Sequence, residues 1–304
     1  MKIAVTGASG FIGRYLVEAL LADGHQVVAL GRAGSGKPAQ AGGGLIAEET
    51  DYSEQSLTGI FAGLDAVVHL AGRRMTREDE PNRLAPFVEP NVLATENLMR
   101  AAKAAGASKV AIASTIAVYS ARNEAPYRET EVPQPLNAYG LSKLMAEQYA
   151  NLYAPTAGIV LTNLRFAAVY GHGEKGTPAL MRFINEATEK RTLTLQGNRL
   201  ISVDQLYVRD AVGAILAALD DKNPGGTFNI GCGDAYTVVE MAETVNSVFG
   251  NAGNLVTENS HEAPARKNRM DISHAAAVLG WRPRYGLAEG LSDFLATRDK
   301  ACDR

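Results

Sequence analysis

The sequence predicts an α/β fold, in which a doubly wound parallel sheet is followed by a smaller C-terminal α/β region. Three observations support this fold class. Short runs of β-branched and apolar residues alternate with helical patterns through residues 1–170, and a glycine-rich turn separates the first run from the first helical pattern. After Gly171 the pattern loosens, and glycine, asparagine and proline become frequent. We therefore expect a regular sheet domain that carries a less regular second region.

The individual elements follow from hydrophobic periodicity. Strands are expected at residues 3–5, 26–30, 45–48, 65–70, 109–114 and 159–164, and helices at 11–22, 91–105 and 138–153. Strands that are separated by helices join through right-handed crossovers, which produce a parallel sheet with helices on both faces.

The border between the two regions is not expected to be a single cut. The segment GTFNIGCGD, residues 226–234, has the pattern of a buried strand that returns to the sheet. We therefore assign residues 1–170, with about 201–232, to the sheet domain. Residues of about 171–200 and 233–304 are assigned to a region that binds the substrate.

Composition and charge exclude several classes of function. Of the 304 residues, 46% are apolar and 21% charged, and the net charge of −3 offers no broad attraction to nucleic acid or to an anionic membrane. Cys232 and Cys302 are far apart and form no metal-type pair. No signal peptide and no run of about 18 apolar residues is evident. A cytoplasmic protein that binds no metal is expected.

The segment TGASGFIG, Thr6–Gly13, lies between the first strand and the first helix. In that context Gly7 permits a tight turn, Gly10 lets the backbone approach a pyrophosphate, and Gly13 allows the helix to pack closely on the strand. The free N–H groups at the helix N-terminus, around Ser9, Phe11 and Ile12, favour phosphate. A purely structural glycine turn is the alternative.

The segment VALGRAGSGKP, residues 28–38, has two possible interpretations. Gly31–Lys37 has the G-x-x-x-x-G-K spacing of nucleotide hydrolases, but Pro38 replaces the Ser or Thr that would bind magnesium. We favour the other interpretation, in which the second strand ends at Gly31 and Arg32. An acidic residue at that point would hold the ribose hydroxyls of NAD, whereas a guanidinium suits the 2′-phosphate of NADP. The local chemistry therefore favours NADP.

Tyr139 and Lys143 lie four residues apart on the expected helix 138–153, and hence on one face. A nearby ammonium favours the deprotonated form of a phenol, which would make Tyr139 a base. Ser114 and Thr115 end the fifth strand, at the edge where open α/β sheets bind ligands, and either hydroxyl would hold a substrate oxygen beside Tyr139. An exposed Tyr–Lys helical pair is the alternative. The order of the three motifs favours catalysis.

The chain resembles the extended short-chain dehydrogenase/reductases, in particular the NAD(P)-dependent nucleotide-sugar epimerases and dehydratases that are UDP-galactose or UDP-N-acetylglucosamine 4-epimerase-like. Besides the motifs above, the resemblance rests on DAVVHLAG (65–72), NVLATENLMRAAKAAG (91–106), LRFAAVYG (164–171), LYVRDAV (206–212) and DISHAAAVLGWRP (271–283). It implies a Rossmann-type sheet, a homodimer formed through helices 91–105 and 138–153, and NAD as the alternative cofactor. It also implies Thr115 as the catalytic hydroxyl, Tyr139 as the base and Lys143 as its partner. Further cofactor contacts are implied at Asp51, Tyr52, Leu70, Ala71, Gly72 and Asn91, and Tyr139 and Lys143 would also contact the cofactor.

The sequence departs from the family pattern at three places. Ser114, Thr115 and Ile116 stand where dehydratases carry Thr-Asp-Glu, which argues against 4,6-dehydration. Ala168 stands where many members have an asparagine against the sugar nucleotide, and Val203 stands where an arginine clamps the diphosphate.

Other side chains are expected to complete the substrate site. Arg199 or Arg266 would supply the missing guanidinium for the diphosphate. Arg73, after the fourth strand, and His172, in the loop YGHGEKG, would face the sugar. Surface roles are the alternative for both.

The leading hypothesis is an epimerase of a nucleotide sugar, with a UDP-sugar 4-epimerase favoured, in which Tyr139 removes a hydroxyl proton during transient hydride abstraction. The first alternative is a nucleotide-4-keto-sugar reductase that consumes NADPH. The second, of another class, is a catalytically silent regulatory protein that senses NAD(P).

Overall fold

The computed structural model describes residues 1–32, 43–176, 178–260 and 267–302, and it has the predicted α/β fold. Its main sheet contains seven strands in the order β11-β6-β5-β4-β1-β2-β3, and every neighbouring pair is parallel. The strands are β1 (Lys2–Thr6), β2 (Gln26–Gly31), β3 (Leu45–Glu49), β4 (Ala66–His69), β5 (Lys109–Thr115), β6 (Val160–Phe166) and β11 (Gly226–Ile230). The strand order reverses between β1 and β4, because β2 and β3 follow on one side of β1 and β4, β5 and β6 on the other. Such sheets bind ligands at this position.

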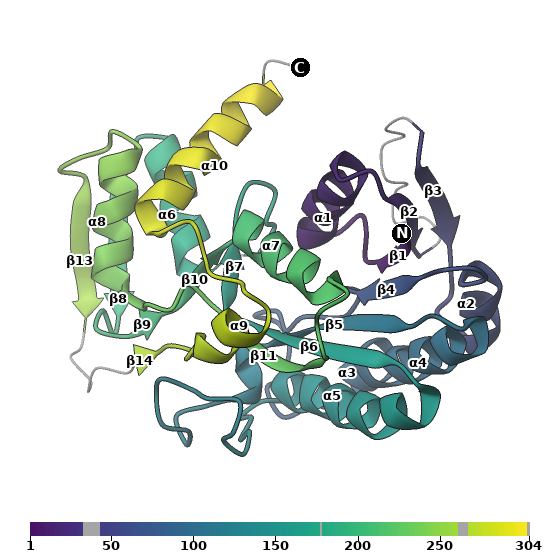
Figure 1. Ribbon diagram of the computed structural model, residues 1–304. Coiled ribbons are helices and arrows are strands. Elements are labelled where there is room, and N and C mark those ends of the chain that lie inside the picture. The colour runs from purple at the N-terminus through teal and green to yellow at the C-terminus, as the bar shows by residue number, and fades with distance from the viewer. Residues whose placement is uncertain (33–42, 177, 261–266, 303–304) are drawn as a thin grey trace.

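Helices cover both faces of this sheet (Figure 1). On one face lie α1 (Phe11–Ala22) and α7 (Val208–Leu219). On the other lie α2 (Glu54–Ile60), α4 (Ala94–Ala105) and α5 (Ala138–Ala157). Leu16, Ile215 and Leu98 are among the fully buried apolar side chains at these contacts. Each such side chain stabilises the fold by about 1.5–3 kcal/mol relative to an exposed one, so the sheet domain is a rigid platform.

Two expected helices differ in extent from the sequence prediction. The helix expected at residues 91–105 is preceded by a short helix α3 (Ala85–Phe87) and a π-helical segment (Val88–Leu93), so that only Ala94–Ala105 is regular. Helix α5 continues past Pro155 to Ala157 and ends at Gly158, which has a φ of +66°. Proline is tolerated here because it stands in the last turn, immediately before a left-handed glycine.

The second region gathers beside the sheet (Figure 1). It contains the helices α6 (Ala179–Thr188), α8 (Val238–Val248) and α10 (Leu287–Cys302), and the short strand pairings of β7 (Ala168–Tyr170) with β10 (Gln205–Tyr207) and of β8 (Leu193–Gly197) with β13 (Leu255–Ser260). A third small sheet joins β12 (Tyr236–Thr237), β9 (Ser202–Val203) and β14 (Lys267–Asn268). Its own core includes Tyr170, Phe183, Tyr207 and Phe294.

Part of the C-terminal segment packs against the sheet domain. Helix α9 (Ser273–Val278) contacts β11, and Ala275 and Trp281 belong to the apolar cluster on the α1 and α7 face. The indole of Trp281 donates to the carbonyl of Asp210 at 3.1 Å, and the Asp210 carboxylate accepts the backbone N–H groups of residues 284 and 285. The sequence assigned residues 233–304 to the substrate region. Part of this range, from α9 to residue 285, packs on the sheet domain and attaches the second region to it.

Candidate functional site

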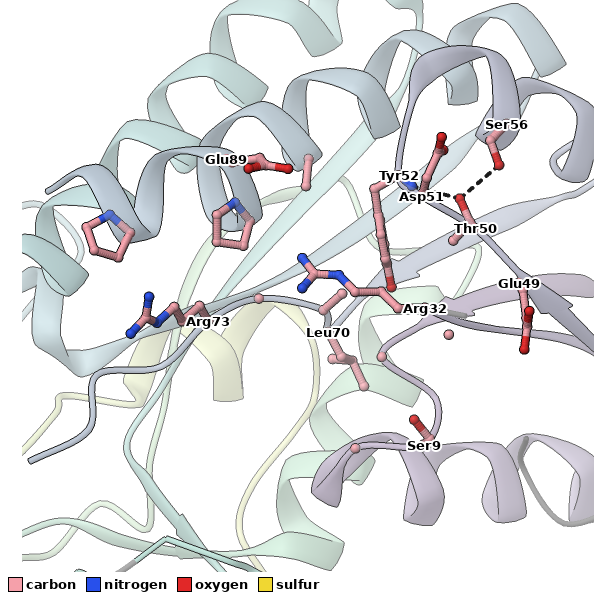
Figure 2. A pocket seen from close by; sticks show the side chains of 18 residues that line it. Ser9, Arg32, Glu49, Thr50, Asp51, Tyr52, Ser56, Leu70, Arg73 and Glu89 are labelled. Carbon is pink, nitrogen blue, oxygen red and sulfur yellow. Dashed lines mark hydrogen bonds between the residues drawn. The ribbon is translucent and has the colours of Figure 1, made fainter. Parts of the chain in front are cut away.

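A cavity of about 1000 Å³ opens at the carboxyl ends of β1, β2 and β4. It is lined by most of the residues that the sequence suggested for a dinucleotide: Gly7, Ser9, Gly10, Gly31, Arg32, Asp51, Tyr52, Leu70, Ala71 and Gly72. Figure 2 shows Ser9 at the start of α1 and the Arg32 side chain extending alongside Tyr52. The wall also contains Glu49, Thr50, Ser56, Arg73, Pro86, Glu89, Pro90 and Ala94, of which only Arg73 was predicted as a site residue.

The glycine turn has the geometry that a phosphate group requires. Gly7 has a φ of +68°, and a Cβ atom there would lie 2.8 Å from the backbone N of Ala71. A Cβ atom on Gly13 would lie 2.2 Å from the carbonyl oxygen of Gly7. Helix α1 begins after Gly10 without a side-chain cap, so the N–H groups of its first turn are available to an anion. Phe11 and Ile12 contribute only backbone here, because their side chains pack into the core of the second region.

The far wall of the cavity combines charges of both signs. The exposed Arg32 guanidinium lies 5.8 Å from the ring centroid of the buried Tyr52. The Asp51 carboxylate accepts the backbone N–H of Ser53 at 2.9 Å, and hydrogen bonds from Ser53 lower the pKa of Asp51. Glu49 adds a second carboxyl group. This wall therefore offers both a guanidinium for a phosphate and carboxylates that would repel one.

Asn91 supports the loop after β4 from behind. Its side chain is outside the cavity lining and its residue is 1% exposed. The Asn91 Oδ1 accepts the backbone N–H of Arg73 at 2.7 Å, and Nδ2 donates to the Arg73 carbonyl at 3.0 Å and to the Ser142 hydroxyl at 2.9 Å. Asn91 thus joins helix α5 to the loop that lines the cavity, and its contact with a cofactor stays a prediction.

The structure brings Thr115, Tyr139 and Lys143 together beside this cavity. Asn137 caps α5 by accepting the backbone N–H of Gly140 at 2.7 Å, which fixes the start of the helix. The Thr115 side chain hydrogen-bonds Tyr139. The buried Lys143 Nζ lies 4.0 Å from where a Cβ atom on Gly72 would stand, and therefore next to the loop that lines the cavity.

Burial opposes charge on both ionisable groups of this cluster. It raises the pKa of the Tyr139 phenol, while the Thr115 hydrogen bond and the Arg74 guanidinium act in the opposite direction. Burial also lowers the pKa of Lys143 to about 8, against the opposing effect of the Glu147 carboxylate. Burial therefore moves the pKa of Lys143 toward neutral pH and that of Tyr139 away from it, so the phenol needs the neighbouring hydroxyl and positive charges to lose its proton.

Ser114 and Thr115, which the sequence left as alternatives, have different partners. The Ser114 hydroxyl donates a short hydrogen bond to the Glu147 carboxylate, and it is buried. Thr115 is the residue whose hydroxyl contacts Tyr139. The geometry therefore favours Thr115 as the hydroxyl that faces a substrate.

An ion pair joins the loops that follow β4 and β7. Arg74 donates from Nη2 and Nη1 to the two carboxylate oxygens of Glu174, at 2.8 and 3.1 Å. The Glu174 side chain is 1% exposed and that of Arg74 62%, so the buried carboxylate fixes the direction of an accessible guanidinium. Because Arg74 lowers the pKa of Tyr139, this guanidinium is within electrostatic reach of the phenol.

The remaining predicted residues have separate positions. The His172 ring packs edge-to-face on Phe294, with 5.7 Å between centroids, and Ala168 pairs with Gln205 in the β7–β10 ladder. Arg199 lies half-buried in the turn before β9, and Arg266 lies outside the described residues, as do residues 33–38 of the segment VALGRAGSGKP. Arg73 pairs with Asp79 and lies 5.2 Å above the Phe87 ring, at the cavity wall.

Two searches of the described residues bear on other classes of function. Across residues 1–32, 43–176, 178–260 and 267–302, no group of three His, Cys, Asp or Glu side chains is placed to hold a metal ion. Within the same ranges, no helix has the length and apolar character that crossing a membrane requires.

Residues 3–231, which contain all seven strands of the main sheet except Lys2, and the cluster around Tyr139, match the NAD dependent epimerase/dehydratase family. The chain belongs to this family. As a family member it is 32% identical over 308 residues to a UDP-glucose 4-epimerase of Mycolicibacterium smegmatis, with 96% of each chain covered. The fold and the nucleotide-sugar enzyme class expected from the sequence are thereby confirmed.

Solved structures of other members have the same architecture. A UDP-N-acetylglucosamine 4-epimerase from Bacillus cereus superposes with a TM-score of 0.86 at 35% identity, covering 98% of this chain and 96% of that one. A UDP-glucuronic acid 4-epimerase from Bacillus cereus, in complex with UDP-glucuronic acid and NAD, has a TM-score of 0.86 at 27% identity and covers 99% of this chain and 100% of its own.

Proposed function

We propose that this protein is a nucleotide-sugar 4-epimerase that acts on a UDP-sugar with a tightly held nicotinamide dinucleotide. The observation that supports this most directly is the Thr115–Tyr139–Lys143 cluster beside the cavity that the glycine turn lines. The relatives described above include epimerases of three UDP-sugars. Because those relatives differ in the sugar, the particular sugar is left open.

In this proposal the protein's side chains move the proton of one sugar hydroxyl and hold the oxygen of that hydroxyl in position. Tyr139 accepts the proton of the sugar hydroxyl, and Thr115 hydrogen-bonds the same oxygen and keeps it in line. Lys143, as an ammonium, stabilises the phenolate form of Tyr139. A bound nicotinamide supplies the hydride acceptor and donor at this site. After the oxidised sugar has rotated in the site, the hydride would return to the opposite face of the carbon and invert its configuration, and Tyr139 would give its proton back to the oxygen.

The cofactor that we propose is NAD. The glycine turn and the free N–H groups of α1 suit the diphosphate of either cofactor. The B. cereus relative contains NAD, and the comparisons lend no support to the preference for NADP that Arg32 suggested. The carboxyl groups of Glu49 and Asp51 on the same wall disfavour a 2′-phosphate. In this arrangement the Arg32 guanidinium stacks on the adenine ring of NAD, beside Tyr52.

Replacing Arg32 by alanine is expected to weaken NAD binding by about 3- to 10-fold, which is the loss expected for one exposed cation–π or stacking contact. Isothermal titration with NAD and NADP, on wild-type and variant protein freed of the cofactor that they carry, measures this effect. A wild-type protein that binds NADP more tightly, and loses that preference in Arg32→Ala, would show that the guanidinium binds a phosphate instead.

The experiment that tests the proposed function uses the purified protein without added cofactor. Denaturation should release NAD, which is identified by mass spectrometry. Nuclear magnetic resonance of a panel of UDP-, dTDP-, GDP- and CDP-sugars should show inversion at C4 for a UDP-sugar. Stoichiometric consumption of NADPH would instead indicate the 4-keto-sugar reductase, and cofactor binding without turnover of any sugar would indicate the regulatory protein.

Two finer features are also proposals. Arg199 is our candidate for the diphosphate, because Val203 occupies the usual arginine position. A homodimer through α4 and α5 is supported by the exposed apolar side chains of α5, with Leu141, Met145 and Leu152 exposed by 41%, 38% and 75%.

kcat/KM is expected to rise with pH as Tyr139 loses its proton. Arg74→Gln is expected to move this rise to higher pH. The guanidinium lowers the pKa of Tyr139, so its removal raises that pKa, and the phenol then loses its proton only at higher pH. We expect a shift of about one pH unit in kcat/KM. Arg83→Gln, a change at another exposed arginine of the same loop, is the control. An unchanged profile in Arg74→Gln would show that Arg74 does not act on Tyr139.

A further inference from the structure

Strand β2 lacks the carboxylate that commonly binds the ribose of NAD. In sheets of this type an acidic side chain at the end of the second strand hydrogen-bonds the hydroxyl groups of the adenosine ribose. Here β2 ends at Gly31 and is followed by Arg32, and both residues line the cavity. A guanidinium offers no acceptor to a hydroxyl group, so NAD in this cavity needs another partner for its ribose.

The two ends of the cavity define where the ribose of a bound NAD would lie. The diphosphate is expected at the free N–H groups of α1, which begins after Gly10. The adenine is expected beside Arg32 and Tyr52, whose guanidinium and ring are 5.8 Å apart. The ribose joins these two groups, so we expect it between them, over Gly31.

Strand β3 places a carboxylate beside Gly31. The two strands are parallel, Gly31 is paired with Glu49, and the backbone N–H of Thr50 donates to the Gly31 carbonyl at 3.0 Å. Paired residues of neighbouring strands are about 4.8 Å apart and point to the same face of the sheet. Glu49 is exposed and lines the cavity, and Figure 2 shows the Arg32 guanidinium extending away from it. Because glycine has no side chain, the Glu49 side chain can reach the space over Gly31.

The turn after β3 engages the next carboxylate along the chain. Tyr52 has a φ of +62°, and its backbone N–H donates to Thr50 Oγ1 at 2.9 Å. In the same turn the Asp51 carboxylate accepts the backbone N–H of Ser53 at 2.9 Å. Asp51 is therefore held by its own turn.

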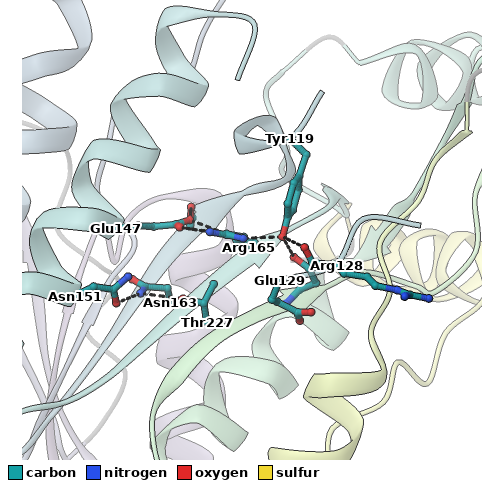
Figure 3. Close-up of polar contacts among 10 residues, drawn as sticks. Tyr119, Arg128, Glu129, Glu147, Asn151, Asn163, Arg165 and Thr227 are labelled. Carbon is teal, nitrogen blue, oxygen red and sulfur yellow. Dashed lines mark hydrogen bonds and ion pairs between the residues drawn. The ribbon is translucent and has the colours of Figure 1, made fainter. Parts of the chain in front are cut away.

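Two further carboxylates near the site are paired within the protein. Glu174 binds the Arg74 guanidinium through both oxygens. Glu147 lies in the interior, where Arg165 Nη2 is 2.7 Å from its Oε2 and the Ser114 hydroxyl donates to its Oε1 (Figure 3). The Glu147 side chain is 1% exposed, so it offers no surface to a ligand.

Glu49 differs from these carboxylates in having no such partner. Among residues 1–32, 43–176, 178–260 and 267–302, its side chain has no hydrogen-bond or ion-pair partner. Glu89 also lines the cavity, but it belongs to the segment before α4, and Figure 2 shows it away from the end of β2. Glu49 is thus the carboxylate that is both next to the expected ribose and available to it.

We propose that Glu49 determines the cofactor specificity: its carboxylate accepts hydrogen bonds from the hydroxyl groups of the adenosine ribose of NAD, and it repels the 2′-phosphate of NADP. The neighbouring strand thereby supplies the charge that β2 lacks. This inference rests on the function proposed above, because it takes NAD to be the bound cofactor.

The test compares Glu49→Gln with the control Glu48→Gln. Both residues are exposed on β3, and both changes remove one negative charge. Glu48 pairs with Leu30, points to the other face of the sheet and does not line the cavity. The control therefore accounts for the change in the net charge of the protein.

The readout is isothermal titration of NAD, NADP and 2′-deoxy-NAD into protein freed of the cofactor that it carries. We expect Glu49→Gln to weaken the binding of NAD about tenfold, the loss of charge-assisted hydrogen bonds at an exposed site. For 2′-deoxy-NAD, which lacks one of the two hydroxyl groups, the loss should shrink to about threefold. NADP should bind about threefold more tightly, because a repulsive charge is gone. Glu48→Gln should bind all three ligands within about twofold of the wild type.

Several outcomes would overturn the proposal. Unchanged affinity for NAD in Glu49→Gln is one, and equal losses for NAD and 2′-deoxy-NAD are another, since the carboxylate then does not contact the 2′-hydroxyl. Affinity for NADP that does not rise would contradict the repulsion. Because no sugar is present, failure of the proposed function is separate: the expected binding changes in a protein that inverts no UDP-sugar would support the role of Glu49 and refute the epimerase. Absence of NAD binding to the wild type would overturn both.

Discussion

Tyr139→Phe is expected to lower the rate of sugar epimerisation by about 10³-fold, the usual size of the effect when a positioned acid–base group is removed. The change deletes only the phenolic oxygen, which in this structure hydrogen-bonds Thr115. The phenylalanine ring keeps the packing on Phe87, whose ring centroid is 6.2 Å away. Steady-state rates with the best UDP-sugar of the panel provide the measurement.

The same variant distinguishes chemistry from folding. Because Tyr139 is not in the lining of the cavity, NAD should bind to Tyr139→Phe within about threefold of its wild-type affinity. Thr115→Val serves as a companion, since it removes the hydroxyl that holds the substrate oxygen and should lower kcat more than it raises KM. Wild-type turnover in Tyr139→Phe would refute the mechanism, and loss of NAD binding would show that the phenol supports the cofactor instead.

The parts of this structure that the sequence predicted are those with a local signature. Helix α1 spans Phe11–Ala22 as expected, because its apolar periodicity and the preceding glycine turn lie within one short segment. The end of β5 and the start of α5 are likewise local, and the doubly wound topology then brings Thr115 and Tyr139 to the same edge of the sheet.

The contacts that the sequence did not predict join residues that are distant in the chain. Arg74 and Glu174 are 100 residues apart, and Arg165 and Glu147 are 18 apart, so no motif encodes either pair. The only available signal was the position of Glu147, four residues after Lys143 on the same helix. Asn91 is a third example. Its motif predicts a cofactor contact, which stays a prediction, but nothing local to that motif indicated its hydrogen bonds with Arg73 and Ser142.

The glycine turn carries the second large prediction. Gly13→Ala is expected to weaken NAD binding by at least about 100-fold and to lower the free energy of unfolding by about 3 kcal/mol. The added Cβ atom would lie 2.2 Å from the Gly7 carbonyl oxygen and 2.8 Å from Ala8 Cα. Both are backbone atoms, so the turn itself must move, and its N–H groups then no longer converge on the diphosphate. Titration calorimetry and urea denaturation measure the two effects.

Gly59→Ala is the matched control, because it is also a helical glycine in the sheet domain. No heavy atom lies within 4 Å of the position that its Cβ would take, and it lies within helix α2. Alanine should therefore stabilise this helix by up to about 1 kcal/mol and leave the affinity for NAD unchanged. Since the two variants add the same methyl group, their difference isolates the close approach of α1 to the turn. Equal affinities for NAD in both would mean that the dinucleotide binds elsewhere than at the N-terminus of α1.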